Sequence, residues 1–314
     1  MSKRYKPLEG YEISGCAAFD KNLISVWGQQ WPSGDPLEPR PTSTFFFYAD
    51  EPEEDQWAFS GIAEATGIHG CAGLIPAKQW IYVLDDGEVY VVGGGIDDFE
   101  WKITPGKMAF FRSARAIRTG EVFAVGGKRK VFHRESANVW RAWNQGLYPQ
   151  GDKTDLKHAG FADIDGFGLD ELYAAGGHGD LWLGQNSQWT PVNLGTNADL
   201  THVCCASDGF VYVTTQQREV YKGRQYNWLL IQQELTSSVF ESIVDFQGRV
   251  LVATEKDLFE IVKDKFVPAV FPGLPEMRSK AHLAVGDGVL VVAGKDEAAF
   301  FDGTAWSKFL APQP

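Results

Sequence analysis

The chain has 314 residues, of which 44% are hydrophobic and 13% aromatic, so it can bury a sizeable core and does not have the composition of a disordered protein. It has no run of about 18 apolar residues, which excludes a helical membrane span, and its polar start lacks the apolar stretch of a secretory signal. The formal net charge of −12 disfavours broad binding to nucleic acid and favours a cationic partner.

The cysteines predict a reducing compartment. Cys16, Cys71, Cys204 and Cys205 lack the spacing of metal ligands, and the last two are adjacent, which makes a poor disulfide framework for a chain of this size. We therefore expect reduced, buried thiols in a cytoplasmic protein.

The first two predicted units span residues 11–61 and 68–103. Each separates into four short runs rich in β-branched and aromatic residues, bounded by turn residues, as expected of antiparallel strands. An insertion with several prolines at residues 31–41 lengthens one connection of the first unit.

The turn before Trp57 is strongly acidic, with the residues Glu51, Glu53, Glu54 and Asp55. Such a run is either simply solvated or steers a basic partner through long-range attraction that salt weakens. Trp31 offers an apolar anchor for the same partner, although core packing explains an aromatic residue here equally well.

The third predicted unit, residues 107–145, is basic. Residues 106–145 contain nine Lys or Arg against two acidic residues, Glu121 and Glu135. The net charge of the remaining residues is therefore more negative than the −12 of the whole chain. Arg112, Arg115 and Arg118 could direct several guanidinium groups to an anionic ligand, because Arg suits bidentate contacts to carboxylate or phosphate. Alternatively, these charges pair with acidic residues of neighbouring units.

The fourth predicted unit, residues 158–193, contains an acidic stretch at 163–171. It resembles the calcium loops of integrin-type propellers, and the resemblance implies a structural calcium ion held by Asp163, Asp165 and Glu171. Phe167 departs from that pattern, because it stands where a carboxylate is expected. The alternative is an acidic turn between strands that needs Gly166 and Gly168 for its backbone angles.

A second resemblance covers residues 170–182 and 188–196, which read DELYAAGGHGDLW and QWTPVNLGT. These stretches resemble the degenerate bacterial propeller repeat "D-x-V-Y-A-V-G-x-x-G" followed by "G-x-x-W", and residues 122–127 resemble a second copy. The resemblance implies the architecture of WD-like and kelch-like propellers and no particular activity. The chain has no Trp-Asp pair and a single Gly-His pair, at 177–178, so it lacks the recurring Gly-His and Trp-Asp pairs of true WD repeats.

The last three predicted units, 199–232, 239–270 and 280–310, show the four-strand pattern most clearly. In the first of them the runs are 201–206, 210–215, 219–221 and 228–231, separated by polar or glycine-containing turns.

Aromatic residues recur at intervals of 38 to 46 residues, once in each unit: Trp57, Trp101, Trp143, Trp189, Trp228, Phe266 and Trp306. A period of this length indicates a repeat architecture, and four short strands per repeat indicate propeller blades. We predict an all-β, seven-bladed β-propeller over residues 1–314, a single domain in which each aromatic residue heads the outermost strand. Six or eight blades and another all-β fold are the alternatives. Helical repeats of similar period need 3.6-residue apolar faces, which the chain lacks.

The function is less determined than the fold. His69 and His202 begin first strands, which face the axis of a propeller, so they could contribute to a metal, ligand or catalytic site there, or be structural or solvated. The sequence contains no Gly-x-Ser-x-Gly motif of serine hydrolases, no glycine-rich phosphate-binding loop and no His-Glu-x-x-His motif of zinc proteases.

Two function classes follow. The leading hypothesis is a non-enzymatic cytoplasmic propeller that binds another, basic protein, for example a bacterial immunity protein that neutralises a basic toxin or effector. The alternative is an enzyme or small-ligand-binding propeller with its site in the central channel, where His69, His202, Arg112, Arg115 and Arg118 would contact the ligand.

Overall fold

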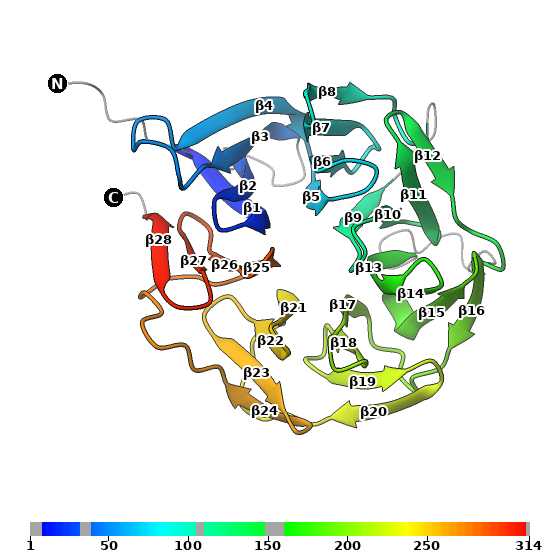
Figure 1. The fold of residues 1–314 in the computed structure, drawn as a ribbon. Coiled ribbons are helices and arrows are strands. Elements are labelled where there is room, and N and C mark those ends of the chain that lie inside the picture. Colours follow the sequence, from blue (N-terminus) through cyan, green and yellow to red (C-terminus); the bar gives the residue numbers. More distant parts are fainter. Residues whose placement is uncertain (1–7, 32–38, 105–109, 148–159, 312–314) are drawn as a thin grey trace.

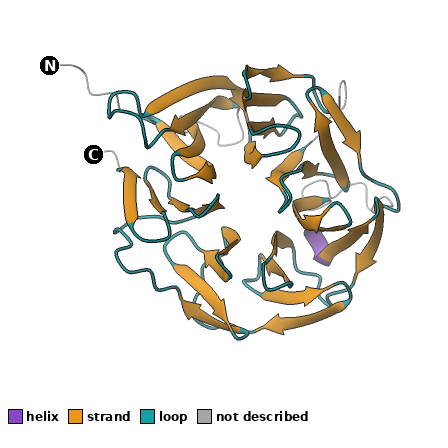
Figure 2. Cartoon of the chain, viewed as in Figure 1, coloured by secondary structure: helices purple, strands orange, loops and turns teal. Residues whose placement is uncertain are grey.

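The computed structural model describes residues 8–31, 39–104, 110–147 and 160–311. This part of the chain forms seven antiparallel sheets of four strands, arranged as blades around a central axis (Figure 1). Figure 2 shows that the regular structure is almost entirely strand, with one short 3-10 helix, η1 (Gly177–Gly179). The predicted all-β, seven-bladed propeller is therefore confirmed. The described residues include no helix long and apolar enough to cross a membrane.

In each blade the four strands follow chain order from the axis to the rim. Blade 1 contains β1 (Tyr11–Asp20), β2 (Leu23–Gln30), β3 (Arg40–Phe47) and β4 (Trp57–Ala65). Blade 2 contains β5 (Ile68–Gly73), β6 (Gln79–Leu84), β7 (Val89–Gly93) and β8 (Ile96–Glu100). Blade 3 contains β9 (Phe111–Ala116), β10 (Val122–Gly126), β11 (Lys130–Ser136) and β12 (Val139–Ala142).

The remaining blades repeat this arrangement. Blade 4 contains β13 (Phe161–Gly168), β14 (Glu171–Gly176), β15 (Asp180–Gln185) and β16 (Gln188–Val192). Blade 5 contains β17 (Leu200–Cys205), β18 (Val211–Thr215), β19 (Val220–Arg224) and β20 (Asn227–Ile231). Blade 6 contains β21 (Ser242–Phe246), β22 (Arg249–Ala253), β23 (Leu258–Val262) and β24 (Lys265–Pro268), and blade 7 contains β25 (His282–Val285), β26 (Leu290–Ala293), β27 (Ala298–Phe301) and β28 (Trp306–Leu310).

The hydrophobic core lies between the blades. Each apolar cluster draws buried residues from two adjacent sheets; one joins Tyr173 and Leu183 of blade 4 to Val203 and Val213 of blade 5. Because both faces of a blade are covered by its neighbours, its middle strands read as continuous apolar runs rather than as alternating ones.

Within residues 8–311, as far as the structure describes them, blade 7 and blade 1 close the ring as two separate sheets, each built from its own four consecutive strands. The Ile13 N–H donates to the Lys295 carbonyl oxygen at 2.7 Å, and the Asp287 N–H donates to the Phe19 carbonyl oxygen at 2.7 Å. An apolar cluster that includes Val26 and Val291 fills the same seam. Side-by-side packing thus closes the ring.

Glycines end two of the second strands for a steric reason. A Cβ atom on Gly126 would collide with the Phe110 carbonyl oxygen, and one on Gly176 would collide with the Gly160 carbonyl oxygen. Both contacts lie where the backbone leads into the first strand of the same blade. Glycine permits this close approach because it has no Cβ atom.

The alternating strand directions create two faces. The turns from first to second strand and from third to fourth strand lie at one end of the sheets; we call this the hairpin face. The turns from second to third strand and the connections between blades lie at the other end; we call this the crossover face. Residues facing a partner can therefore be assigned to one end of the propeller from topology alone.

The prediction for the aromatic series was correct for blades 1, 4, 5, 6 and 7, where the aromatic residue begins the fourth strand or is its second residue. It was wrong for Trp101 and Trp143, which directly follow β8 and β12. Their environments also differ, because Trp189 is 1% exposed whereas Trp101 is 76% exposed.

Candidate functional site

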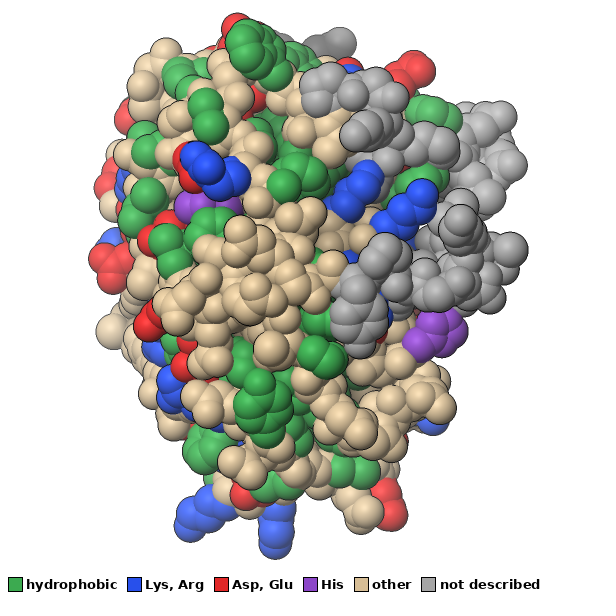
Figure 3. Space-filling view, turned by 90° about the vertical axis from the view of Figure 1, so that its right-hand side faces the viewer, with side chains coloured by type: hydrophobic (Ala, Val, Ile, Leu, Met, Phe, Trp, Pro, Cys, Tyr) green, Lys and Arg blue, Asp and Glu red, His purple; other side chains and the backbone are tan. Residues whose placement is uncertain are grey.

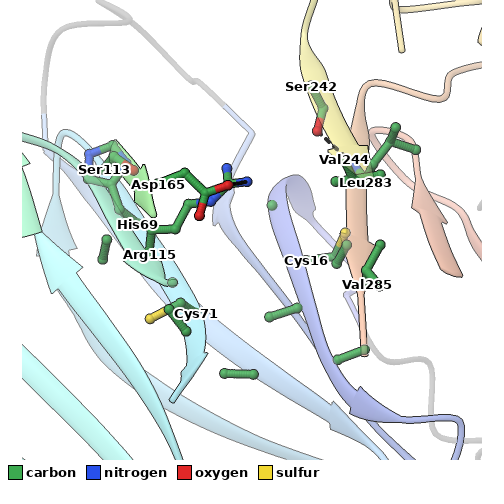
Figure 4. Close-up of a pocket in the computed structure, with 18 of the residues that line it drawn as sticks. Cys16, His69, Cys71, Ser113, Arg115, Asp165, Ser242, Val244, Leu283 and Val285 are labelled. Atoms are coloured by element: carbon green, nitrogen blue, oxygen red, sulfur yellow. Dashed lines mark hydrogen bonds and ion pairs between the residues drawn. The ribbon is translucent and has the colours of Figure 1, made fainter. Parts of the chain in front are cut away.

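A central channel runs through the propeller, with a cavity of about 920 Å³ lined by the first strands of all seven blades. The five residues predicted for a channel ligand, His69, Arg112, Arg115, Arg118 and His202, all line this cavity. Figure 4 shows His69, Ser113, Arg115 and Asp165 on one side of the opening and Ser242, Leu283 and Val285 across from them. Topology thus brings together residues that lie far apart in the sequence.

Arg115 is paired with two carboxylates of blade 4. Its guanidinium lies 3.3 Å from an Asp163 oxygen and 3.4 Å from an Asp165 oxygen. Burial disfavours the charged guanidinium, but Asp165 and Asp163 outweigh this cost and raise the pKa of Arg115. Arg115 is therefore committed to protein carboxylates and does not present a bare cation to the channel.

The same carboxylates bind the next blade. Asp163 accepts hydrogen bonds from the Ser113 hydroxyl at 2.9 Å and the Val203 N–H at 3.0 Å, and Asp165 accepts from the Cys205 N–H at 2.8 Å. Blades 3, 4 and 5 are thereby joined at the channel wall. Burial raises the pKa of Asp165, and the Arg115 charge and the backbone N–H groups oppose this shift.

The stretch predicted as a calcium loop or as an acidic turn lies mostly in two strands, β13 and β14. Asp163 and Asp165 lie inside the strand β13. Glu171 begins β14 and is bound elsewhere: it accepts from the Arg224 guanidinium at 2.7 Å and from the Tyr173 hydroxyl at 2.7 Å. The described residues contain no group of three His, Cys, Asp or Glu placed to hold a metal ion.

The charge of the channel is mixed rather than basic. Arg118 lies 3.7 Å from Asp245 and donates to the Ala206 carbonyl oxygen. The basic lining residues are Lys78, Arg112, Arg115 and Arg118, and the acidic ones are Asp20, Asp163, Asp165, Glu241, Asp245 and Asp287. Pairing between adjacent blades, the alternative weighed for the basic unit, therefore describes Arg115, whereas Arg118 lies near Asp245 of blade 6, which is not adjacent to blade 3.

Three histidines lie along the channel: His69, His202 and His282. Each imidazole is partly accessible from the cavity and is otherwise surrounded by protein. Burial lowers the pKa of His69 and of His282 to about 4 and also lowers that of His202, so all three are neutral at pH 7. Sequence reasoning missed His282, although it too begins a first strand, the signal that identified the other two.

The acidic turn joins β3 to β4, and Glu51, Glu53, Glu54 and Asp55 are all exposed. This turn belongs to the hairpin face, and the Asn22 side chain of the β1–β2 turn donates to Asp50. Trp31 follows the end of β2 and is 48% exposed, which places it on the crossover face. The predicted partner-binding residues therefore do not share one end of the propeller.

The hairpin face is acidic beyond this turn. Its turns carry the acidic residues Asp20, Asp50, Glu51, Glu53, Glu54, Asp55, Glu121, Asp170, Asp208, Asp264, Asp287 and Asp302 and the basic residues Lys21, Lys78, Arg118 and Lys263. In Figure 3 the propeller is seen from its side, and acidic side chains recur along the left edge.

Comparison with solved structures identifies the architecture. The chain is similar to a streptogramin B lyase, with a TM-score of 0.65, 11% identity and 92% of each chain covered. It is similar to the WD40 propeller domain of Doa1, with a TM-score of 0.64, 13% identity and coverage of 91% of this chain and 92% of the other. A virginiamycin B lyase from Staphylococcus aureus has a TM-score of 0.59 at 9% identity, with 76% of this chain and 82% of that chain covered.

At these identities the likeness shows the fold alone. It confirms the resemblance to WD-like propellers that the repeats indicated. No family model matches the chain.

Comparison with curated proteins goes further. The chain is 30% identical over 261 residues to the immune protein Tsi7 of Pseudomonas aeruginosa, and the match covers 82% of each protein. The hypothesis of an immunity protein is thereby confirmed at the level of the family. The chain belongs to the family of the immune protein Tsi7.

Proposed function

We propose that this protein is an immunity protein that binds a basic toxin through its acidic hairpin face and thereby keeps the toxin from acting. The observation that carries the proposal is the relationship to the immune protein Tsi7 over most of both chains. A rigid ring of blades with many surface turns suits the binding of another protein.

The basic character of the partner is inferred from charge. The net charge is −12, and the acidic turn residues of the hairpin face far outnumber the basic ones. Complementary charge speeds association and selects against partners of the wrong charge. At physiological salt, screening limits the range of this attraction to about 8 Å. The contact would therefore tighten at low ionic strength.

The channel gives less support to the alternative of an enzyme or a small-ligand protein. Arg115 and Arg118 face carboxylates of the protein itself. Burial raises the pKa of the channel thiols Cys16 and Cys71 to about 12, so both are protonated at neutral pH and are poor nucleophiles.

We place the action of the protein in the cytoplasm. The four cysteines are free and buried, which is compatible with a reducing compartment.

The test uses the protein encoded by the gene next to this one as the toxin, with growth of co-expressing bacteria and binding of the purified proteins as the two measurements. The double variant Glu51→Lys/Glu54→Lys should bind at least about tenfold more weakly at low salt and protect less well. The matched control is Glu234→Lys/Glu276→Lys, which changes the net charge equally at exposed positions of the crossover face.

The control variant should bind like the native protein. Equal loss in both double variants, or no loss in either, would contradict the proposed use of the hairpin face. Absence of protection by the native chain would contradict the proposed function.

A further inference from the structure

The turn from β5 to β6 is an apolar part of the acidic hairpin face. It consists of residues 74–78, and its first three residues, Leu74, Ile75 and Pro76, are all exposed. Each of the other six turns from first to second strand contains at least one Asp, Asn, Ser, Thr or Gln, whereas this turn has none of them and ends in Lys78. We call Leu74, Ile75 and Pro76 the apolar lip, because β5 is the strand of blade 2 nearest the axis and Leu74 lines the channel cavity (Figure 1).

The exposure of the apolar lip distinguishes it from single apolar side chains on the surface. Leu74 is 54% exposed and Ile75 is 43% exposed. Isolated exposed apolar residues are normal, whereas three in sequence are unfavourable in water unless they contact another molecule. Phe210, also on the hairpin face, differs, because the Lys222 ammonium lies over its ring, 4.5 Å from the centroid. The apolar lip therefore has the character of a contact surface.

Backbone hydrogen bonds hold the apolar lip in position on the next blade. The N–H groups of Leu74 and Ile75 both donate to the Gly120 carbonyl oxygen, at 3.0 Å and 3.1 Å. Gly120 belongs to the β9–β10 turn of blade 3, and a Cβ atom added to it would lie only 2.6 Å from the Leu74 Cβ atom. The two turns are thus closely packed. A surface that is already ordered loses less conformational entropy when a partner binds.

Carboxylates lie on both sides of the apolar lip. Lys78, at the end of the same turn, lies 3.3 Å from Asp20 of blade 1. On the other side, the β9–β10 turn carries Glu121 and also Arg118, whose guanidinium lies 3.7 Å from Asp245. Both cations beside the lip are therefore offset by carboxylates of the protein. A partner that reaches the lip across the acidic hairpin face would be favoured by positive charge around its own apolar contact.

We propose that the apolar lip is the anchor of the toxin contact, and that the toxin segment bound there carries an apolar side chain flanked by Lys or Arg. The inference rests on the proposed function and specifies which part of the hairpin face supplies the binding energy. In protein interfaces a few side chains that become fully buried supply most of this energy. The charges around them set the association rate and the choice of partner.

The first test removes apolar surface without changing the net charge. Leu74→Ser/Ile75→Ser should bind the product of the neighbouring gene at least about tenfold more weakly than the native protein does, because less apolar area is buried. The matched control is Leu229→Ser/Leu230→Ser in the outermost strand of blade 5, where the side chains are 45% and 42% exposed; it should bind like the native protein. Equal losses in both double variants, or no loss in the first, would overturn the proposal.

Salt separates the apolar contact from the attraction between charges. The loss of affinity caused by Leu74→Ser/Ile75→Ser should be the same at low and at high salt, whereas the loss caused by Glu51→Lys/Glu54→Lys should shrink as salt is added. A loss that disappears at high salt in the first variant would mean that it acts through charge, and would overturn the apolar anchor.

A second measurement detects the contact itself. The four native cysteines are buried, so Ile75→Cys adds an exposed thiol that a maleimide can modify. Toxin at about 100 times its Kd for this variant should slow the modification at least about tenfold. The thiol of the control Leu230→Cys should react at the same rate with and without toxin. An unchanged rate at Ile75→Cys in the complex would overturn the proposal.

The two proposals fail in different ways. If Glu51→Lys/Glu54→Lys loses the toxin while Leu74→Ser/Ile75→Ser binds it like the native protein, the apolar anchor is wrong and the immunity function stands. If the native chain neither binds nor protects against the toxin, the proposed function itself is wrong.

Discussion

At the scale of single residues, the charged side chains of the channel serve the wall of the propeller. The Arg115 guanidinium lies between two nearly buried carboxylates, Asp163 and Asp165, and the Oδ2 atoms that it contacts also accept backbone N–H groups of blade 5. Each carboxylate has a partner in the folded protein, and loss of the shared cation would leave two buried charges with less compensation.

We expect Arg115→Met to lower the free energy of unfolding by about 3 kcal/mol, because it leaves both carboxylates without their cation. Chemical denaturation at pH 7 measures this change. Arg141→Met is the matched control, since it breaks a pair with Glu135 in which Arg141 is largely exposed, and it should have no measurable effect. A loss no larger than that of the control would show that Asp163 and Asp165 need no counter-ion.

At the scale of elements, the same aromatic position plays different parts in different blades. Trp189 lies inside β16, packs on Phe161 and donates its indole N–H to the Trp143 carbonyl oxygen at 2.8 Å. Trp101 follows β8 and is mostly exposed. A repeat period predicts where an aromatic residue stands in the chain, but its packing against a neighbouring blade decides whether it is buried.

Trp189→Ala should therefore lower the free energy of unfolding by about 3–5 kcal/mol through the cavity that it creates. Trp101→Ala, at the equivalent point of blade 2, should change it by less than about 0.5 kcal/mol. Thermal or urea unfolding of both variants gives the comparison. Similar losses for the two variants would mean that the repeat position, rather than burial, sets the contribution.

At the scale of the whole molecule, closure of the ring shields much of each channel histidine from bulk water. His69, His202 and His282 come from blades 2, 5 and 7 and share one cavity only because seven blades enclose it. The unfolded chain exposes them to solvent, where the pKa of histidine is about 6.5. The folded protein lowers the pKa of His69 and His282 to about 4.

This difference predicts a pH dependence of stability. A folded pKa below the unfolded one contributes stability that is present above pH 6.5 and is lost as the pH falls towards 4, since the unfolded chain binds protons first. Each histidine should contribute a slope of about 1 kcal/mol per pH unit in this window. The raised pKa of Asp165 acts in the opposite direction at acidic pH, because protonation relieves its buried charge.

Urea unfolding between pH 7 and pH 4 is the measurement. The variant His69→Gln/His282→Gln should show a shallower decline than the native protein, and His178→Gln, an exposed position, controls for the loss of a histidine outside the channel. An unchanged slope in the double variant would contradict the assignment to the channel.

The sequence by itself determined the repeat and hence the blades. Short apolar runs such as those of β18 and β22 can be buried only as strands covered on both faces, and turn residues separate them at a regular period. It also indicated that His69, His202 and the three arginines of blade 3 face the axis. These inferences succeed because they depend on local alternation and on the fixed position of the first strand.

Only the tertiary structure decided which charges meet. Asp163 and Asp165 resembled a metal loop because sequence spacing does not show that Arg115, 48 residues before Asp163, lies beside them. The tertiary structure likewise separated Trp31 from the acidic turn by placing them at opposite ends of blade 1. Side-chain partners across blades depend on long-range register, and a repeat pattern carries no information about that register.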